Sequence, residues 1–212
     1  MIIDISQEVF SCRTFPGDPK RQFRRMTSMD GGADYNLTEF TMCAHNGTHI
    51  DAPYHYLPEG KRITDYPVSR FIGEGIVLDL RHKKAGEAIT KEDLMPLQKT
   101  IREGDFLVLQ TGWCEKYGEE EYLNHPYLTK DAAQQLVNLG VRIVAVDFLN
   151  VDPTLWEQWD VHPVLLGNEV LIVENLNNTL QLDTGKRYCF CFAPIKLQGS
   201  DGGPVRAFAV ER

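Results

Sequence analysis

Six short runs of the sequence are almost continuously apolar and are rich in β-branched or aromatic residues. They are Gly75–Leu80, Phe106–Gln110, Val141–Phe148, Val170–Glu174, Tyr188–Ala193 and Val205–Val210. Runs of this composition are typical of strands that are covered on both faces, as in sheets with a parallel centre. The pattern predicts a large, buried β-sheet, and every other element has to pack around it.

One helix is clearly predicted, over Lys130–Leu139. Thr129 can cap its first turn, and Gly140 suits the position just after its last turn. Its apolar stripe consists of Ala132, Ala133, Leu136 and Val137. The helix lies between two strand runs, which is the order of a βαβ crossover. A second, shorter helix is predicted to open at Thr90.

The first 60 residues have a different character, because turn signals such as Pro16-Gly17-Asp18-Pro19 separate short segments. Neither a linker nor a repeat divides the chain, so residues 1–212 are expected to form one domain. The predicted fold class is α/β, with a mixed β-sheet that closes into a barrel-like core and carries flanking helices.

Charge and composition exclude several classes of partner. The net charge is −8 and no basic run occurs, which argues against nucleic acid and against an anionic membrane surface. No apolar run reaches the roughly 20 residues that span a bilayer. No signal peptide is visible at the start of the sequence. The five cysteines lack the spacing of a disulfide framework, so we expect reduced thiols in a cytoplasmic protein.

The most informative segment for function is residues 45–55. It reads His-Asn-Gly-Thr-His-Ile-Asp-Ala-Pro-Tyr-His and holds three of the six histidines of the chain. Imidazole nitrogens and carboxylate oxygens are the ligands that zinc and similar divalent cations prefer. The segment therefore predicts a metal site.

The spacing of His45 and His49 matches that of the H-E-x-x-H metalloproteases, but a helix does not fit here. Asn46 replaces the general-base Glu, Gly47 weakens a helix, and Pro53 would break one. An extended backbone is expected instead. Ligands from one short segment leave coordination positions open, which is typical of a catalytic site.

Further ligands have to come from elsewhere in the chain. Two candidates are His162, after a Trp-rich stretch at 156–160 that is expected to be a loop, and Glu174, at the end of an apolar run. An acid in this place can equally be an ordinary surface charge. His82 and His125 are expected to be solvated loop residues.

The segment His45-x-Gly-Thr-His49-x-Asp51-x-Pro53-x-His55 resembles the signature of the cyclase-like metal-dependent hydrolases, which include the bacterial kynurenine formamidases and the isatin hydrolases. Three other segments are similar to parts of the same family: Ile3-Asp4-Ile5-Ser6 with Pro16-Gly17-Asp18, His162-Pro-x-Leu-Leu with Glu174-Asn175-Leu176, and Asp201-Gly-Gly-Pro204-Val-Arg206-Ala. The resemblance covers most of the chain.

The resemblance implies a role for each site residue. His45, His49 and Asp51 would bind one ion, and Asp51, His162 and Glu174 a second. His55 would be the proton donor and acceptor. The implied cofactor is a divalent metal, zinc in preference to manganese, with one or two ions per subunit. The implied fold is a mixed β-barrel of the swivelling β/β/α type, assembled as a homodimer or homotetramer.

Two positions differ from the formamidases and bear on the substrate. In their Trp-Pro-Gly-Asp stretch the Trp contacts the aromatic substrate, whereas this chain has Phe15, which can stack but lacks the indole donor. We expect Phe15 to bind substrate. Asn150 stands where the family's Asp-x-x-Ser-x-Asp segment has Ser.

The first hypothesis for function is therefore metal-dependent hydrolysis of a C–N bond in a small amide. The leading substrate is an aryl formamide such as N-formylkynurenine. The alternatives are a cyclic amide, opened as isatin is, or a lactone. A hypothesis of a different class is a non-catalytic metal-binding protein on the same fold.

Overall fold

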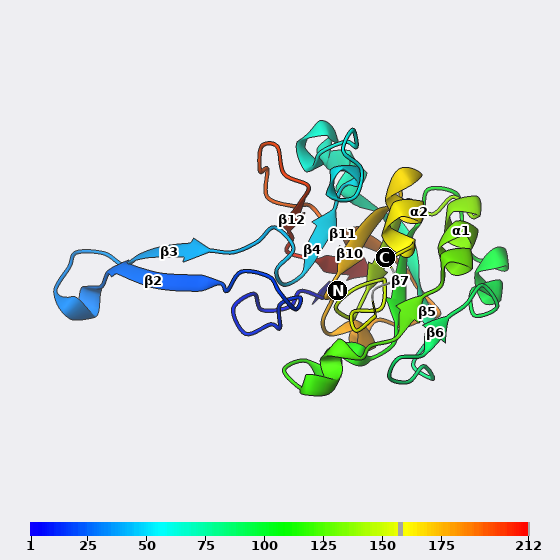
Figure 1. The fold of residues 1–212 in the computed structure, drawn as a ribbon, viewed down its shortest axis with the longest axis horizontal. Helices are drawn as coiled ribbons and strands as arrows, with labels where there is room; N and C mark the ends of the chain where they lie inside the picture. The colour runs from blue at the N-terminus through cyan, green and yellow to red at the C-terminus, as the bar shows by residue number, and fades with distance from the viewer. Residues whose placement is uncertain (157–158, 212) are drawn as a thin grey trace.

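A mixed β-sheet forms the centre of the computed structural model, which describes residues 1–156 and 159–211 (Figure 1). In this part of the chain the sheet has nine strands in the order β1-β13-β11-β5-β7-β9-β10-β4-β12. These strands are β1 (Ile2–Asp4), β4 (His49–Asp51), β5 (Ile72–Asp79), β7 (Phe106–Gln110), β9 (Ile143–Val146), β10 (Leu171–Glu174), β11 (Arg187–Cys191), β12 (Gly202–Pro204) and β13 (Phe208–Glu211). Two small sheets pair β2 (Gln22–Thr27) with β3 (Leu37–Thr41) and β6 (Ala88–Ile89) with β8 (Tyr127–Leu128).

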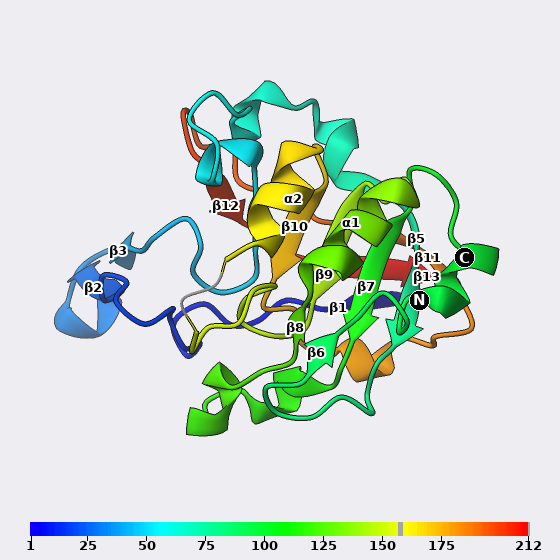
Figure 2. The same ribbon diagram turned by 45° about the vertical axis from the view of Figure 1, so that its right-hand side comes forward.

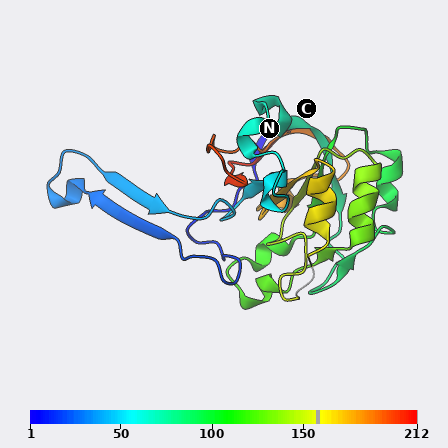
Figure 3. The same ribbon diagram turned by 45° about the horizontal axis from the view of Figure 1, so that its top comes forward.

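The centre of the large sheet is parallel and its two sides are antiparallel. Strands β5, β7, β9 and β10 pair in parallel, and the remaining neighbours pair in antiparallel fashion. The sheet curls into a half-barrel (Figure 3). The predicted α/β class with a barrel-like mixed sheet is thus confirmed, and the six predicted strand runs all contain or overlap strands of this sheet.

Two α-helices cover one face of the parallel centre, α1 (Lys130–Asn138) and α2 (Val161–Gly167) (Figure 2). The predicted cap is present, because Thr129 Oγ1 accepts a hydrogen bond from Ala132 N at 3.2 Å. Alternate residues of each central strand pack either against these helices or into the hollow of the half-barrel. This two-sided burial is why the strand runs are almost continuously apolar.

One of the predicted helices was wrong. The segment at Thr90 does not start an α-helix: it makes a turn, Thr90 N donating to Asp93 Oδ2, followed by a 3₁₀ helix over Met95–Lys99. Pro96 has no N–H to give and its ring opposes a regular α-helix. Helix α2 was not predicted. It starts at Val161, directly after the Trp-rich stretch, whose described residues 156, 159 and 160 lie outside helices and strands, as expected. Residues 157 and 158 of that stretch lie outside the described residues.

His125 is buried rather than solvated. Its ring stacks on Phe148 with centroids 5.3 Å apart. Its Nδ1 donates to the Pro126 carbonyl at 2.7 Å, and Thr154 Oγ1 donates to Nε2 at 2.7 Å. Burial lowers the pKa of His125 to about 4. The neutral imidazole is therefore the form that the folded protein keeps.

This burial predicts a specific loss of stability in acid. The unfolded chain takes up the His125 proton near pH 6.5, whereas the folded chain takes it up only near pH 4. Stability contributed by neutral His125 is thus complete above pH 6.5 and is lost as the pH falls towards 4. The loss is about 3 kcal/mol in unfolding free energy. We expect denaturant melts to show it in the wild type and not in His125→Gln, which keeps a donor and an acceptor but cannot titrate. If the unfolding free energies of the wild type and His125→Gln fell in parallel between pH 7 and 4, the prediction would be contradicted.

One element stands away from the body. The hairpin arm, residues 22–41, consists of β2, a 3₁₀ turn (Met29–Gly31) and β3, and it extends far from the sheet in two views (Figures 1 and 3). Almost all of its strand residues are exposed. Among the described residues, no helix is long and apolar enough to cross a membrane.

Candidate metal centre and active site

The segment 45–55 is extended, as predicted, and not helical. It forms the short strand β4 (His49–Asp51) and then a 3₁₀ turn, η2 (Pro53–His55). Gly47 has φ +70°, and a Cβ there would lie 3.2 Å from Val9, so both its dihedral and its space suit glycine. The Gly47 carbonyl accepts a hydrogen bond from His49 Nδ1 at 2.8 Å. This bond leaves the Nε2 lone pair of His49 free to bind a ligand.

Sheet pairing brings Glu174 to the same place. Strand β10 pairs with β4 in antiparallel fashion, with Glu174 opposite His49. Glu174 Oε1 accepts a hydrogen bond from Val151 N at 2.8 Å, and Oε2 lies 3.4 Å from His49 Nε2. The acid at the end of this apolar run is buried and held in position, so it is not an ordinary surface charge.

Helix α2 brings His162 to the cluster, and Asp152 orients it. The Asp152 carboxylate accepts from the backbone N–H groups of Val161 and His162, at 2.9 and 3.1 Å, where the helix starts. It also lies 2.6 Å from His162 Nδ1. The Nε2 atom of His162 therefore points at Asp51 and Glu174, at 3.6 and 3.5 Å. The contact of Asp152 with His162 was not predicted: the residue ends the Asp-x-x-Ser-x-Asp segment, but that segment does not show which side chain it faces.

Two groups of potential ligand atoms share Asp51. Atoms of His45, His49 and Asp51 lie within 4.8 Å of one another, and so do atoms of Asp51, His162 and Glu174. Asp51 Oδ1 is 2.7 Å from His45 Nδ1 and 3.3 Å from His49 Nε2. The structure thus brings together all five residues that the sequence suggested as ligands, with the central carboxylate between the two groups.

The charges of this cluster favour a cation. Burial by itself lowers the pKa of His45 and His49, but the Asp51 carboxylate overrides it and raises the pKa to about 9 and about 10. Burial by itself raises the pKa of Glu174, but hydrogen bonds from His162 and His49 lower it to about 2. Buried carboxylates at the centre thus attract positive charge, either protons or metal ions.

One carboxylate oxygen of the cluster has no hydrogen-bond partner among the described residues, its contact with His162 Nε2 being 3.6 Å long. Asp51 Oδ2 is fully buried and accepts no hydrogen bond from any described residue. A buried carboxylate oxygen in that state is costly unless a cation is bound to it. Together with the imidazole and carboxylate donors around it, this orphaned oxygen fits a divalent metal.

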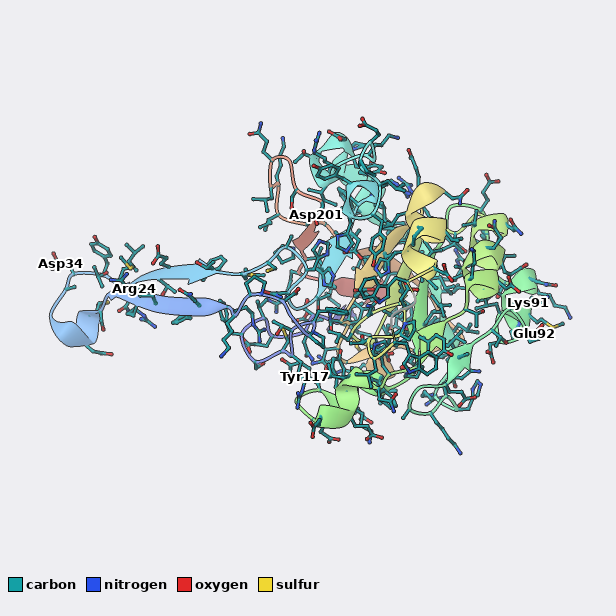
Figure 4. The ribbon with its side chains drawn as sticks, viewed as in Figure 1. Arg24, Asp34, Lys91, Glu92, Tyr117 and Asp201 are labelled. Carbon is teal, nitrogen blue, oxygen red and sulfur yellow. The ribbon has the colours of Figure 1, made fainter. Side chains whose placement is uncertain are left out.

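His55 lies at the edge of the cluster. Its ring stacks on that of His45, with centroids 3.9 Å apart and planes at 25°. His55 Nδ1 is 3.1 Å from Asp201 Oδ2, and the same oxygen is 2.8 Å from His45 Nε2. Asp201 precedes β12, which pairs with β4, and it lies on the side of the body from which the hairpin arm leaves (Figure 4). Its proximity to both rings was not predicted.

A pocket opens onto this cluster. It has a volume of about 480 Å³, in the range of small-molecule sites. Its polar lining includes His45, His49, His55, His162, Glu174 and Asp201, and its apolar and aromatic lining includes Phe15, Tyr56, Leu149 and Trp159. Phe15 is one of the lining residues, and its contact with substrate stays a prediction. Tyr56 and Trp159 were not predicted as lining residues; Tyr56 stacks on His162 with centroids 4.5 Å apart.

Comparison with known proteins finds similar proteins along nearly the whole chain. Residues 3–153 match the Cyclase family model, described as "Putative cyclase". The kynurenine formamidase of Bacillus thuringiensis (strain Al Hakam) is 33% identical over 207 residues, which are 97% of this chain and 95% of that protein. A solved structure titled as a potential metal-dependent hydrolase with cyclase activity has 27% identity and a TM-score of 0.82, covering 100% of this chain and 98% of that one.

A further solved structure shares the fold. Isatin hydrolase A from Ralstonia solanacearum has a TM-score of 0.88 at 22% identity, covering 100% of this chain and 92% of that chain. The curled sheet with its flanking helices is thus an arrangement that other proteins also use.

Proposed function

This chain belongs to the Cyclase family, and from that premise we propose that it is a metal-dependent hydrolase of a C–N bond in a small amide, with residues 1–212 as one catalytic domain. The leading substrate is an aryl formamide such as N-formylkynurenine, the class that the Bacillus relative's name indicates. The observation that carries the proposal is the double ligand group around Asp51 at the wall of a largely apolar pocket.

The proposal assigns the ligands as follows: His45, His49 and Asp51 hold one ion, and Asp51, His162 and Glu174 hold a second. Zinc is the proposed metal because imidazole and carboxylate ligands suit it, with manganese as the alternative. When bound, the metal polarises a carbonyl group and lowers the pKa of a water molecule from about 15.7 towards about 7.

His55 has the proton-transfer role in this proposal. It borders the pocket, its side chain is partly exposed, and its Nδ1 is engaged by Asp201. Its Nε2 atom is then available to substrate. Hydrolysis of an amide requires a proton on the departing nitrogen, and a neutral imidazole can take one from water and pass it on.

The apolar wall suits an aromatic substrate. Phe15 and Trp159 line the pocket, and Leu149, another lining residue, also belongs to the buried core. Aromatic side chains bind an aryl ring by burying its apolar surface and by stacking on it. Phe15 offers no donor for a hydrogen bond, so we propose that it holds the ring of the substrate by stacking alone.

The substrate assignment is tested on metal-replete protein with three substrates: N-formylkynurenine, isatin and a simple aryl lactone. The proposal expects the highest kcat/KM for the formamide. A higher value for isatin would move the assignment to cyclic amides. Background rates on all three, in protein with a full metal content, would favour the non-catalytic metal-binding alternative.

We also propose that the chain works as a homo-oligomer, a dimer or tetramer, in the reducing cytoplasm. The five cysteines are unpaired, which suits that compartment. The hairpin arm carries exposed apolar side chains: Phe23, Met26, Met29, Tyr35, Leu37 and Phe40. A two-stranded hairpin is marginally stable alone, and exposed apolar patches mark interaction surfaces. A second copy of this chain is the partner that we propose for the arm.

The double variant Phe23→Ser/Phe40→Ser is expected to dissociate the oligomer. The two rings lie opposite each other on β2 and β3, and both are more than half exposed in the single chain. Losing the burial of several aromatic side chains should raise the dissociation constant at least about 100-fold. Light scattering during gel filtration measures the mass. Val68→Ser/Met95→Ser, which changes exposed apolar residues outside the arm, is the matched control. A monomeric wild type, or an unchanged mass in the arm variant, would refute the proposal.

A further inference from the structure

Backbone contacts hold Asp201 in place beside the candidate metal centre. Its backbone carbonyl accepts a hydrogen bond from Ala52 N at 2.8 Å, which ties it to the segment between β4 and η2. The next residue, Gly202, has no room for a side chain: a Cβ there would lie 2.7 Å from the Ile50 carbonyl oxygen and 2.8 Å from His45 Cε1. The backbone is thus held close enough for the Asp201 carboxylate to reach the histidine rings.

One oxygen of the Asp201 carboxylate lies within hydrogen-bond distance of two imidazole rings. Asp201 Oδ2 lies 2.8 Å from His45 Nε2 and 3.1 Å from His55 Nδ1. His45 has a second carboxylate at its other nitrogen, Asp51 Oδ1 at 2.7 Å. Among the described residues, the hydrogen-bond partner found for the His55 ring is Asp201. Removal of Asp201 would therefore leave His45 with its second carboxylate, whereas His55 would keep its ring contacts but lose the hydrogen bond at Nδ1.

The tautomer of His55 depends on this contact. A carboxylate accepts hydrogen bonds and donates none, so the atom of His55 that faces Asp201 has to be Nδ1–H. The other ring nitrogen, Nε2, is then the basic atom and is directed away from Asp201. A neighbouring carboxylate also stabilises the imidazolium that forms when Nε2 takes a proton.

We propose that Asp201 is a positioning residue for the hydrolytic reaction, which fixes the orientation and tautomer of His55. This inference rests on the proposed function. His55 Nε2 takes a proton from the water whose oxygen bonds to the amide carbon. When the C–N bond breaks, its electron pair leaves with the nitrogen, and the same proton passes from Nε2 to that nitrogen. The imidazole returns to its neutral form with Nδ1–H still donated to Asp201, and the products are an acid and an amine.

A double-mutant cycle tests whether Asp201 acts through His55. In otherwise wild-type, zinc-loaded protein, Asp201→Ala is expected to lower kcat for an aryl formamide about 100-fold, because positioning of an acid–base group contributes at this level. In the His55→Ala background the same change should lower it less than about 3-fold. Zinc content, measured by elemental analysis, should stay unchanged. Asp131→Asn, an exposed carboxylate in the first turn of α1, is the control and should leave kcat unaltered.

Two results would overturn the inference. If Asp201→Ala lowered kcat by the same factor in the His55→Ala background as in the wild type, Asp201 would not act through His55. A fall in zinc content parallel to the fall in rate would mean that it only supports His45. Asp201→Glu, which keeps the charge, is expected to recover part of the lost rate.

A spectroscopic readout keeps the inference testable if the proposed substrate is wrong. Long-range ¹H–¹⁵N NMR of the zinc-loaded protein distinguishes the two imidazole tautomers of each histidine. His55 is expected as Nδ1–H in the wild type and as a mixture of tautomers in Asp201→Ala, whatever the rate of any substrate. An inactive wild type that still shows this change would refute the proposed function and leave the positioning role standing. An unchanged His55 tautomer in Asp201→Ala would refute the positioning role.

Discussion

Asp51→Asn is expected to lower the rate of amide hydrolysis at least about 1000-fold and to abolish tight metal binding. Asp51 is the residue that belongs to both ligand groups, and its Oδ2 atom is buried without a hydrogen-bond partner among the described residues. An asparagine keeps the size of the side chain but replaces one oxygen by an NH₂ group, which cannot bind a cation. A factor of 1000 corresponds to about 4 kcal/mol in the activation barrier, which is within what a catalytic metal supplies.

The measurement is zinc content and kcat/KM on the same preparation. The matched control is Asp105→Asn, which also changes a buried aspartate but one that pairs with Arg187 on another part of the sheet. The control should lose stability and keep its metal. A full complement of zinc in Asp51→Asn, with a rate within about 10-fold of the wild type, would show that this carboxylate is not the shared ligand.

His55→Ala is expected to keep the metal and to lose at least about 100-fold in rate, the lower end of what general acid–base catalysis contributes. His55 borders the pocket and contacts Asp201, and it lies outside both three-residue ligand groups that share Asp51. Its removal takes away the group that carries the proton to the departing nitrogen. A storage or structural metal site would have no need of such a group beside it.

Zinc content and kcat of His55→Ala are measured together with those of His82→Ala. The side chain of His82 is mostly exposed, and its Nε2 lies 3.7 Å from Asp93. Both residues are far in the sequence from the residues of the metal cluster. His82→Ala should behave as the wild type. An unchanged rate in metal-replete His55→Ala would remove the proton-transfer role and, with it, the main argument against a non-catalytic site.

The sequence predicted those features that depend on neighbouring residues. Strand runs and helix α1 follow from local pattern, because burial on both faces of a strand and one face of a helix leaves a periodic signal. The candidate ligands at 45–51 could be found for the same reason: they stand on one short extended segment, where His49 and Asp51 point to the same side. Their extended conformation followed from Gly47 and Pro53 alone.

Contacts across the fold left no such signal. Glu174 lies next to His49 only because β10 pairs with β4. From the residues alone, Glu174 could equally be a metal ligand or an ordinary surface charge. Asp152 and Asp201 were assigned no role, since a single aspartate in a loop looks the same whether it faces water or a histidine. His125 was misplaced for the converse reason: its flanking Asn and Pro suggest a surface loop, whereas packing against Phe148 buries it.

The central claim is that hydrolysis of an aryl formamide requires the metal held around Asp51. The most direct measurement is a titration of metal-free protein with zinc, in which bound zinc and the rate of N-formylkynurenine hydrolysis are determined at each point. We expect a negligible rate without metal and a rate that rises in proportion to the zinc bound, up to one or two ions per chain. Hydrolysis at the full rate in metal-free protein, or no hydrolysis of the formamide at saturating zinc, would contradict it.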